Sequence, residues 1–117
     1  MTIHIKRVYD TASASDGSRI LVDRLWPRGF SKEKLKLDAW MKDLAPSNEL
    51  RKWYSHEEAK WPEFRRRYFK ELKQQPELVA ELRKKARCHT VTLLFSTRET
   101  ERSNAVALKD YLQGKTR

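Results

Sequence analysis

One short run constrains the fold of this chain more than any other segment. Residues 90–96 read Thr-Val-Thr-Leu-Leu-Phe-Ser and form the clearest β-strand pattern in the sequence. Residues 19–25 are also largely apolar and suit a central strand of a sheet. Each run is followed by a turn and then by a helical pattern, an arrangement typical of half a doubly wound sheet. We therefore predict an α/β fold built around these two strands.

Two further segments are candidate strands. Residues 2–8 alternate apolar and polar side chains, as a half-buried strand does. Only about ten residues connect them to residues 19–25, and a helical crossover needs a dozen or more. These two strands are therefore either antiparallel or separated in the sheet, and the sequence leaves both arrangements open. Residues 37–44 fit a strand or a helix; we favour a strand because Ala45-Pro46 stops the segment abruptly.

Serine and proline residues mark the starts of five expected helices. A serine side chain caps the free N–H groups of a first helical turn, and proline is tolerated there. The expected helices cover residues 32–36, 48–54, 62–75, a stretch starting at Pro76 and a last helix that Ser103 caps, ending at Leu112. We predict one small three-layer α/β domain over residues 1–117, with a mostly parallel or mixed sheet of three or four strands flanked by helices.

The composition excludes several classes of protein. A single cysteine, Cys88, rules out an internal disulfide framework and a multi-thiolate zinc site, and the three histidines are widely scattered. We therefore expect no metal and no cofactor. No apolar run approaches the roughly 20 residues of a membrane helix, and the N-terminus has no signal-peptide pattern. We expect a cytoplasmic protein with no membrane partner; the sequence does not indicate an oligomeric state.

The net charge of +10 raises the question of nucleic-acid binding. Residues 1–59 carry 11 basic and 9 acidic side chains, whereas residues 60–117 carry 15 and 7. The excess therefore belongs to the second half, and above all to the helices of residues 60–87. A nucleic-acid-binding accessory protein that uses these helices is one alternative function, and a structural or protein-partner module is another. The alternative without a binding function is a solvated helical face on which Glu and Arg side chains pair.

The candidate site follows from the predicted sheet. Ligands of open α/β sheets bind beyond the carboxyl ends of the strands. Residues 23–29 (Asp-Arg-Leu-Trp-Pro-Arg-Gly) and residues 96–104 should lie there and offer arginines, hydroxyls and a helix N-terminus, which all favour anions. We predict a pocket for a phosphate- or carboxylate-bearing small molecule. The candidate ligand-binding residues are Arg24, Trp26, Arg28, Ser47, Ser96, Thr97, Arg98 and Asn104.

Three residues are candidates for chemistry, although the sequence does not decide whether the protein is an enzyme. Asp23 or Asp43 would orient the arginines or act as a base, and His56 would serve as an acid or base. In the structural alternative, Arg24 pairs with Asp23, Asp43 or Glu99 and only orders loops. Likewise, Trp26 would either stack on a planar ligand or pack in the core.

Several motifs together resemble one bacterial family. They are Ile5-Lys6-Arg7-Val8-Tyr9-Asp10, Asp23-Arg24-Leu25-Trp26-Pro27-Arg28-Gly29 and Lys42-Asp43-Leu44-Ala45-Pro46-Ser47. They resemble the YeaO-like family of the domain-of-unknown-function 488 group. The resemblance implies a small cytoplasmic α/β domain and favours a strand at residues 37–44. More distant members carry Cys and His after the last strand; the corresponding residues 95–104 have neither, so thiol or metal chemistry does not carry over.

Overall fold

The most apolar strand of the sequence lies inside the sheet. The computed structural model describes residues 1–116, and its four strands are all parallel in the order β1-β4-β2-β3. All five residues of β4 are buried between its two neighbours. The strands are β1 (Ile3–Arg7), β2 (Ser18–Leu21), β3 (Ala39–Trp40) and β4 (Val91–Phe95). The predicted fold class, a small α/β domain, is confirmed.

Five α-helices of the described residues 1–116 pack around the sheet. Serine side chains accept hydrogen bonds from first-turn N–H groups of three of them, as expected for Ser31, Ser47 and Ser103. Proline stands in the first turn of the other two. The helices are α1 (Lys32–Leu35), α2 (Asn48–Tyr54), α3 (Trp61–Leu72), α4 (Pro76–Cys88) and α5 (Asn104–Leu112). Short 3-10 turns cover Ala14–Asp16, Lys42–Leu44 and Glu58–Lys60.

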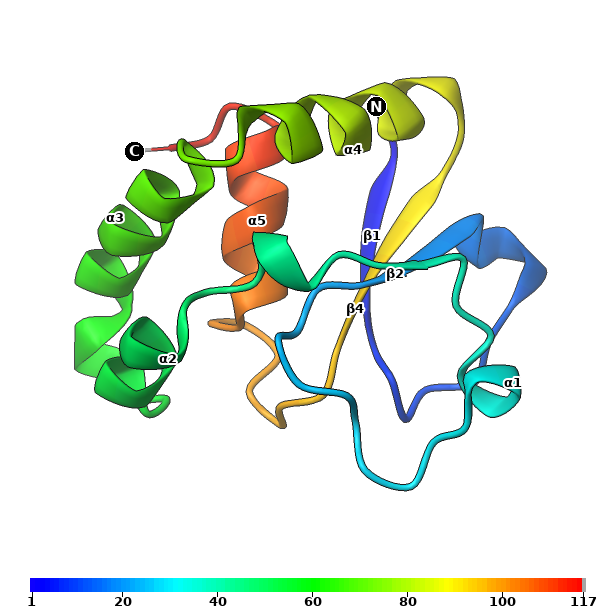
Figure 1. Ribbon diagram of the computed structural model, residues 1–117, viewed down its shortest axis with the longest axis horizontal. Helices are drawn as coiled ribbons and strands as arrows, with labels where there is room; N and C mark the ends of the chain where they lie inside the picture. The colour runs from blue at the N-terminus through cyan, green and yellow to red at the C-terminus, as the bar shows by residue number, and fades with distance from the viewer. Residues whose placement is uncertain (117) are drawn as a thin grey trace.

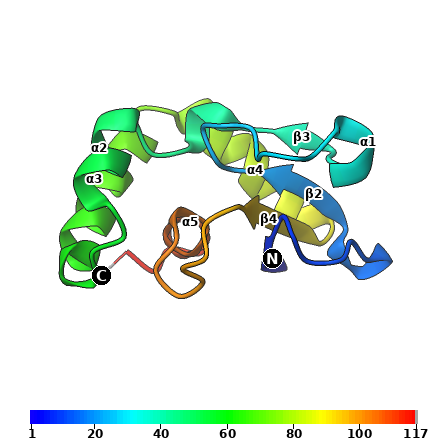
Figure 2. The ribbon, with the colours of Figure 1, turned by 90° about the horizontal axis from the view of Figure 1, so that it is seen from below.

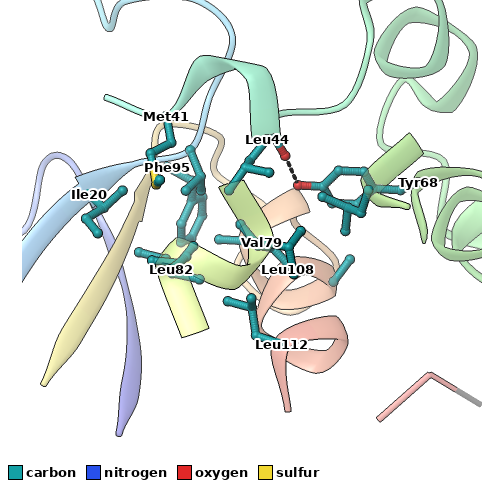
Figure 3. Packing of buried hydrophobic residues seen from close by; sticks show 14 of the residues in the cluster. Ile20, Met41, Leu44, Tyr68, Val79, Leu82, Phe95, Leu108 and Leu112 are labelled. Atoms are coloured by element: carbon teal, nitrogen blue, oxygen red, sulfur yellow. Dashed lines mark hydrogen bonds between the residues drawn. The ribbon is translucent and has the colours of Figure 1, made fainter. Parts of the chain in front are cut away.

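The two faces of the sheet are covered unequally. Helices α2, α3 and α5 lie on one side of the sheet and the short α1 on the other (Figure 1), and the view from below agrees (Figure 2). The larger core, on the helical side, packs Ile20 and Phe95 of the strands against Leu82 and Leu108 of the helices (Figure 3). On the other face a small cluster, Val8, Leu21, Leu35 and Leu94, lies under α1 and nearby loops. The third layer is therefore thin.

The connection between β1 and β2 contains no α-helix. The two strands are parallel and lie on either side of β4, so the separated arrangement is the correct one of the two alternatives. At the end of the connection Gly17 adopts φ +65°, and a Cβ atom there would lie 2.1 Å from the carbonyl oxygen of Thr90. Glycine is required at this position because any side chain would collide with backbone.

A buried carboxylate holds this connection against the sheet. Asp16 lies 2.9 Å from the ammonium of Lys6 and 2.6 Å from the guanidinium of Arg19. Its backbone carbonyl accepts a hydrogen bond from Thr92 of β4 at 2.6 Å. Burial of Asp16 acts to raise its pKa, but hydrogen bonds from Lys6, Ser13 and Arg19 outweigh it and lower the pKa to about 2. Asp16 therefore joins β1 and β2 through its charge and β4 through its backbone carbonyl.

Two expected strands are shorter than the sequence pattern indicates. Residues 37–44 contain only two strand residues, and a 3-10 turn follows. The reason is the partner: β3 pairs with β2, and β2 ends at Leu21, so Met41 makes the last ladder hydrogen bond, to the Leu21 carbonyl at 2.9 Å. The expected strand at residues 19–25 likewise ends early, because the chain turns away after the Val22 N–H bonds the Leu94 carbonyl.

Candidate functional site

A cleft of about 700 Å³ opens beyond the carboxyl ends of the strands. Segments that follow β1, β2 and β4 meet there with the end of α2, as the topology of a parallel sheet predicts. Eight of the eleven residues singled out from the sequence line it. The lining residues are Tyr9, Asp23, Arg24, Leu25, Trp26, Pro27, Arg28, Pro46, Arg51, Lys52, Tyr54, Ser55, His56, Phe64, Ser96, Thr97 and Asn104.

Asp23 holds three elements together at the floor of the cleft. Its Oδ2 accepts hydrogen bonds from the N–H and the hydroxyl of Ser96, at 2.9 and 2.8 Å. Its Oδ1 accepts one from the side chain of Asn104 at 3.2 Å, at the start of α5. Burial raises the pKa of Asp23 above its ordinary value, and these hydrogen bonds oppose the rise. Asp23 therefore does not orient the arginines, as the sequence suggested; it joins the ends of β2 and β4 to α5.

Arg24 orders a loop. Its guanidinium donates to the carbonyl oxygens of Pro46 and Ala45, both at 3.1 Å. No ion pair of Arg24 with Asp23, Asp43 or any other carboxylate is recorded within residues 1–116. The structural role considered from the sequence is thus present, but its acceptors are backbone carbonyls and not the expected carboxylates.

Three other cationic side chains that line the cleft make few contacts with other residues. Arg28, Arg51 and Lys52 are exposed. For residues 1–116 the structure records no hydrogen bond or ion pair of the Arg28 or Lys52 side chain, and the Arg51 side chain makes one long bond, 3.4 Å, to the side chain of Asn48. These side chains face a cleft whose single carboxylate, Asp23, is already occupied. The lining therefore has a surplus of positive charge.

His56 reaches the cleft through an unusual backbone. The helix α2 ends in left-handed conformations at Ser55 (φ 44°) and His56 (φ 57°), which project the imidazole beyond the helix. Its Nε2 lies 3.3 Å from the hydroxyl of Thr97, and its ring contacts Tyr54 at 5.7 Å between centroids. The predicted residues His56 and Thr97 thus lie side by side at the cleft.

Three predicted site residues lie elsewhere. Ser47 donates through its N–H and its hydroxyl to the carboxylate of Glu71, at 2.8 and 2.7 Å, and also caps α2. Asp43 and Ser47 line a separate hollow of about 280 Å³. Arg98 is exposed and does not line the cleft. The expectation that Asp43 and Ser47 share the main site is wrong because the expected strand at residues 37–44 ends after Trp40.

Some residues that line the cleft are not among those predicted from the sequence. Tyr9 follows β1 directly, so the strand-end rule that selected residues 23–29 could have found it. No sequence pattern of this kind identifies Arg51 and Lys52, because they lie within a helix and do not follow a strand. They reach the cleft because α2 packs Tyr54 against Phe64 of α3, with ring centroids 4.3 Å apart.

The basic helices use much of their charge internally. Arg83 of α4 donates to the carbonyls of Tyr111 and Leu112, so it satisfies the last turn of α5. Arg66 and Arg67 share the carboxylate of Glu63, at 2.6 and 2.8 Å. These two side chains lower the pKa of Glu63 to about 2. Arg83 therefore stabilises the fold, whereas Arg66 and Arg67 stay exposed and Glu63 balances part of their charge.

Two further observations concern the described part of the chain. Within residues 1–116 no three His, Cys, Asp or Glu side chains gather in a way that could hold a metal ion. None of the helices in the same range combines the length and the apolar character needed to cross a bilayer.

The proteins and the family model that resemble this chain match it over nearly its whole length. A family model described as "Inactive DUF488-N3 subclade" matches residues 2–117. The Uncharacterized protein YeaO of Escherichia coli (strain K12) is 46% identical over 113 residues, which cover 97% of this chain and 98% of that protein. An uncharacterized protein of Mycobacterium tuberculosis (strain H37Rv) is 42% identical over 113 residues, covering 97% and 95%. No solved structure gives a significant match. The chain belongs to the YeaO-like family of the DUF488 group, as its motifs suggested.

Proposed function

We propose that the cleft binds a small molecule carrying a phosphate or a carboxylate. The observation that carries this proposal is the charge of the lining: Arg28, Arg51 and Lys52 are exposed and make no ion pair recorded within residues 1–116. The one lining carboxylate, Asp23, is committed to Ser96 and Asn104. An anion in the cleft would therefore meet several cations and no free negative charge. Arginine adds a planar fork that matches phosphate and carboxylate oxygens.

We further propose that the cleft holds its ligand without converting it. Both oxygens of Asp23 already accept hydrogen bonds that join the ends of β2 and β4 to α5, so this carboxylate serves the fold. The description of the matching subclade as inactive supports the same proposal.

The test is calorimetric titration of the whole protein with inorganic phosphate and with citrate at low ionic strength. Arg51→Gln combined with Lys52→Gln should weaken binding by about tenfold or more, the equivalent of one lost charge-assisted contact. Lys84→Gln combined with Lys85→Gln is the matched control, because it removes the same charge from α4, outside the cleft lining. Equal losses in both double variants, or no binding by the unmodified protein, would refute the proposal.

A second candidate function rests on a different surface. A groove of about 630 Å³ beside α3 combines the aromatic residues Trp61, Phe69 and Tyr111 with basic side chains. Lys70 and Lys73 line it, are exposed, and have no partner recorded among the described residues. Cations beside aromatic rings are the usual means of binding single-stranded nucleic acid.

A gel-shift titration with a single-stranded oligonucleotide tests this candidate. Binding should weaken steeply with salt and should be lost when Lys70→Gln and Lys73→Gln are combined. Absence of any shift at low salt would exclude it.

A further inference from the structure

Two exposed apolar side chains line the cleft. Within residues 1–116 four large apolar side chains are exposed, namely Met1, Tyr9, Leu25 and Trp40. Tyr9 is 54% and Leu25 58% exposed, and both line the cleft. Scattered exposed leucines are ordinary, but exposed apolar residues grouped at a polar cleft indicate a surface that a ligand covers.

The apolar side of the cleft is held rigidly. The guanidinium of Arg7 lies 4.9 Å from the centroid of the Tyr9 ring and is itself bonded to the carbonyls of Ser96 and Thr97. The indole of Trp26 donates to the Phe30 carbonyl at 2.7 Å. Because these rings are fixed before a ligand arrives, binding against them costs little side-chain entropy.

Two cations of the cleft come from a different element than its exposed apolar side chains. Arg51 and Lys52 come from α2, whereas Tyr9, Leu25 and Trp26 follow β1 and β2. In Figure 1 the helix α2 and the segment after β2 stand on opposite sides of the orange segment that follows β4. A ligand that spans the cleft therefore meets the two α2 cations at one end and, at the other, apolar side chains with the guanidinium of Arg28 on the same segment.

The volume of the cleft adds a constraint on size. About 700 Å³ lies inside the range of roughly 300–1,000 Å³ typical of sites for drug-sized ligands. An inorganic phosphate would fill a small part of this space and would leave Tyr9 and Leu25 exposed.

Resting on the proposed anion-binding function, we propose that the ligand is an organic anion with a flat apolar group, of the aryl phosphate or aryl carboxylate class. The acid group contacts Arg51 and Lys52 of α2, and the flat group covers Leu25 and the rings of Tyr9 and Trp26. Apolar contact thus selects the ligand among anions of equal charge.

The experiment compares phenyl phosphate with inorganic phosphate by calorimetric titration. The unmodified protein should bind phenyl phosphate about tenfold more tightly, because its ring covers apolar surface in the cleft. Leu25→Ser should reduce this preference by about fivefold and leave the affinity for inorganic phosphate unchanged. Ala80→Ser, on the exposed face of α4, is the matched control and should change neither affinity.

The outcomes separate the two proposals. Equal affinity for the two anions, or a preference that survives Leu25→Ser, overturns the aryl-anion inference while leaving anion binding intact. Binding of neither anion overturns the proposed function itself. A Leu25→Ser protein with an unchanged circular dichroism spectrum ensures that its effect comes from the cleft and not from misfolding.

Discussion

Replacing Asp16 by asparagine removes the charge on which the thin side of the sheet depends. The pKa of Asp16 falls from its ordinary 3.8 to about 2 in the folded protein. A difference of nearly two pKa units corresponds to about 2.5 kcal/mol of unfolding free energy. Solvent screens part of the Lys6 interaction, because that side chain is 23% exposed. We therefore expect Asp16→Asn to lower the free energy of unfolding by about 2 kcal/mol at pH 7.

The pH dependence of this loss has a definite sign. The folded-state pKa lies below the unfolded-state value, so the unfolded chain binds the proton more readily. The contribution of Asp16 is therefore complete above about pH 5 and is lost progressively as the pH falls through 3.8 towards 2. The gap between the two proteins should be largest at neutral pH and should close in acid.

Urea denaturation at several pH values, followed by tryptophan fluorescence, measures this gap. Glu63→Gln is an informative control, because the pKa of Glu63 is also about 2 but its partners Arg66 and Arg67 are exposed. Its loss should be smaller than that of Asp16→Asn, since water and salt screen exposed pairs. Equal stability of Asp16→Asn and the unmodified protein at pH 7, or a gap that persists unchanged to pH 2, would refute the reasoning.

Three further substitutions test other contacts by the same denaturation assay. Gly17→Ala should cost about 3 kcal/mol or more, because its Cβ would collide with the Thr90 carbonyl at a positive φ; an unchanged midpoint would contradict this. Tyr68→Phe should cost about 1–3 kcal/mol, since it leaves the buried Leu44 carbonyl without the hydroxyl donor seen in Figure 3. Arg83→Met should cost about 1 kcal/mol by freeing the last carbonyls of α5; a loss no greater than that of Lys84→Met would argue against the capping role.

Local patterns predicted the parts of the fold that local forces decide. The serines at positions 31, 47 and 103 cap helices because their hydroxyls bond N–H groups three residues away. The apolar run at residues 90–96 becomes an inner strand because both of its faces need cover. In each case the residues that decide the structure are neighbours in the sequence.

Other features depend on partners distant in the sequence. The connection between β1 and β2 lacks a helix because Asp16 bonds Lys6, Arg19 and, through its carbonyl, Thr92, a residue 76 positions away. Sequence spacing excluded a helical crossover but could not choose between the two remaining arrangements. Ser47 shows the same limit at the site, since its hydroxyl is directed to Glu71, 24 residues away.

The candidate site was predictable where it follows the ends of strands. The strand-end rule found Asp23, Arg28 and Thr97 because the direction of a parallel sheet brings these ends together. It did not find Arg51 or Lys52, which reach the cleft through packing of α2 on α3. Strand topology therefore determines one part of the cleft, and side-chain packing between α2 and α3 determines the other.

The order of the strands has a consequence for synthesis of the chain. β4 is the last of the described strands to be made but lies between β1 and β2, and within residues 1–116 it alone pairs with β1. On the ribosome, the first 90 residues contain the β2–β3 pair and four of the helices but no complete sheet. Until residues 91–95 emerge, β1 has no strand to pair with, and apolar surface on β2 stays uncovered. Completion of the fold therefore waits for the last quarter of the chain, and a chain that stops before residue 91 is a substrate for chaperones and proteases.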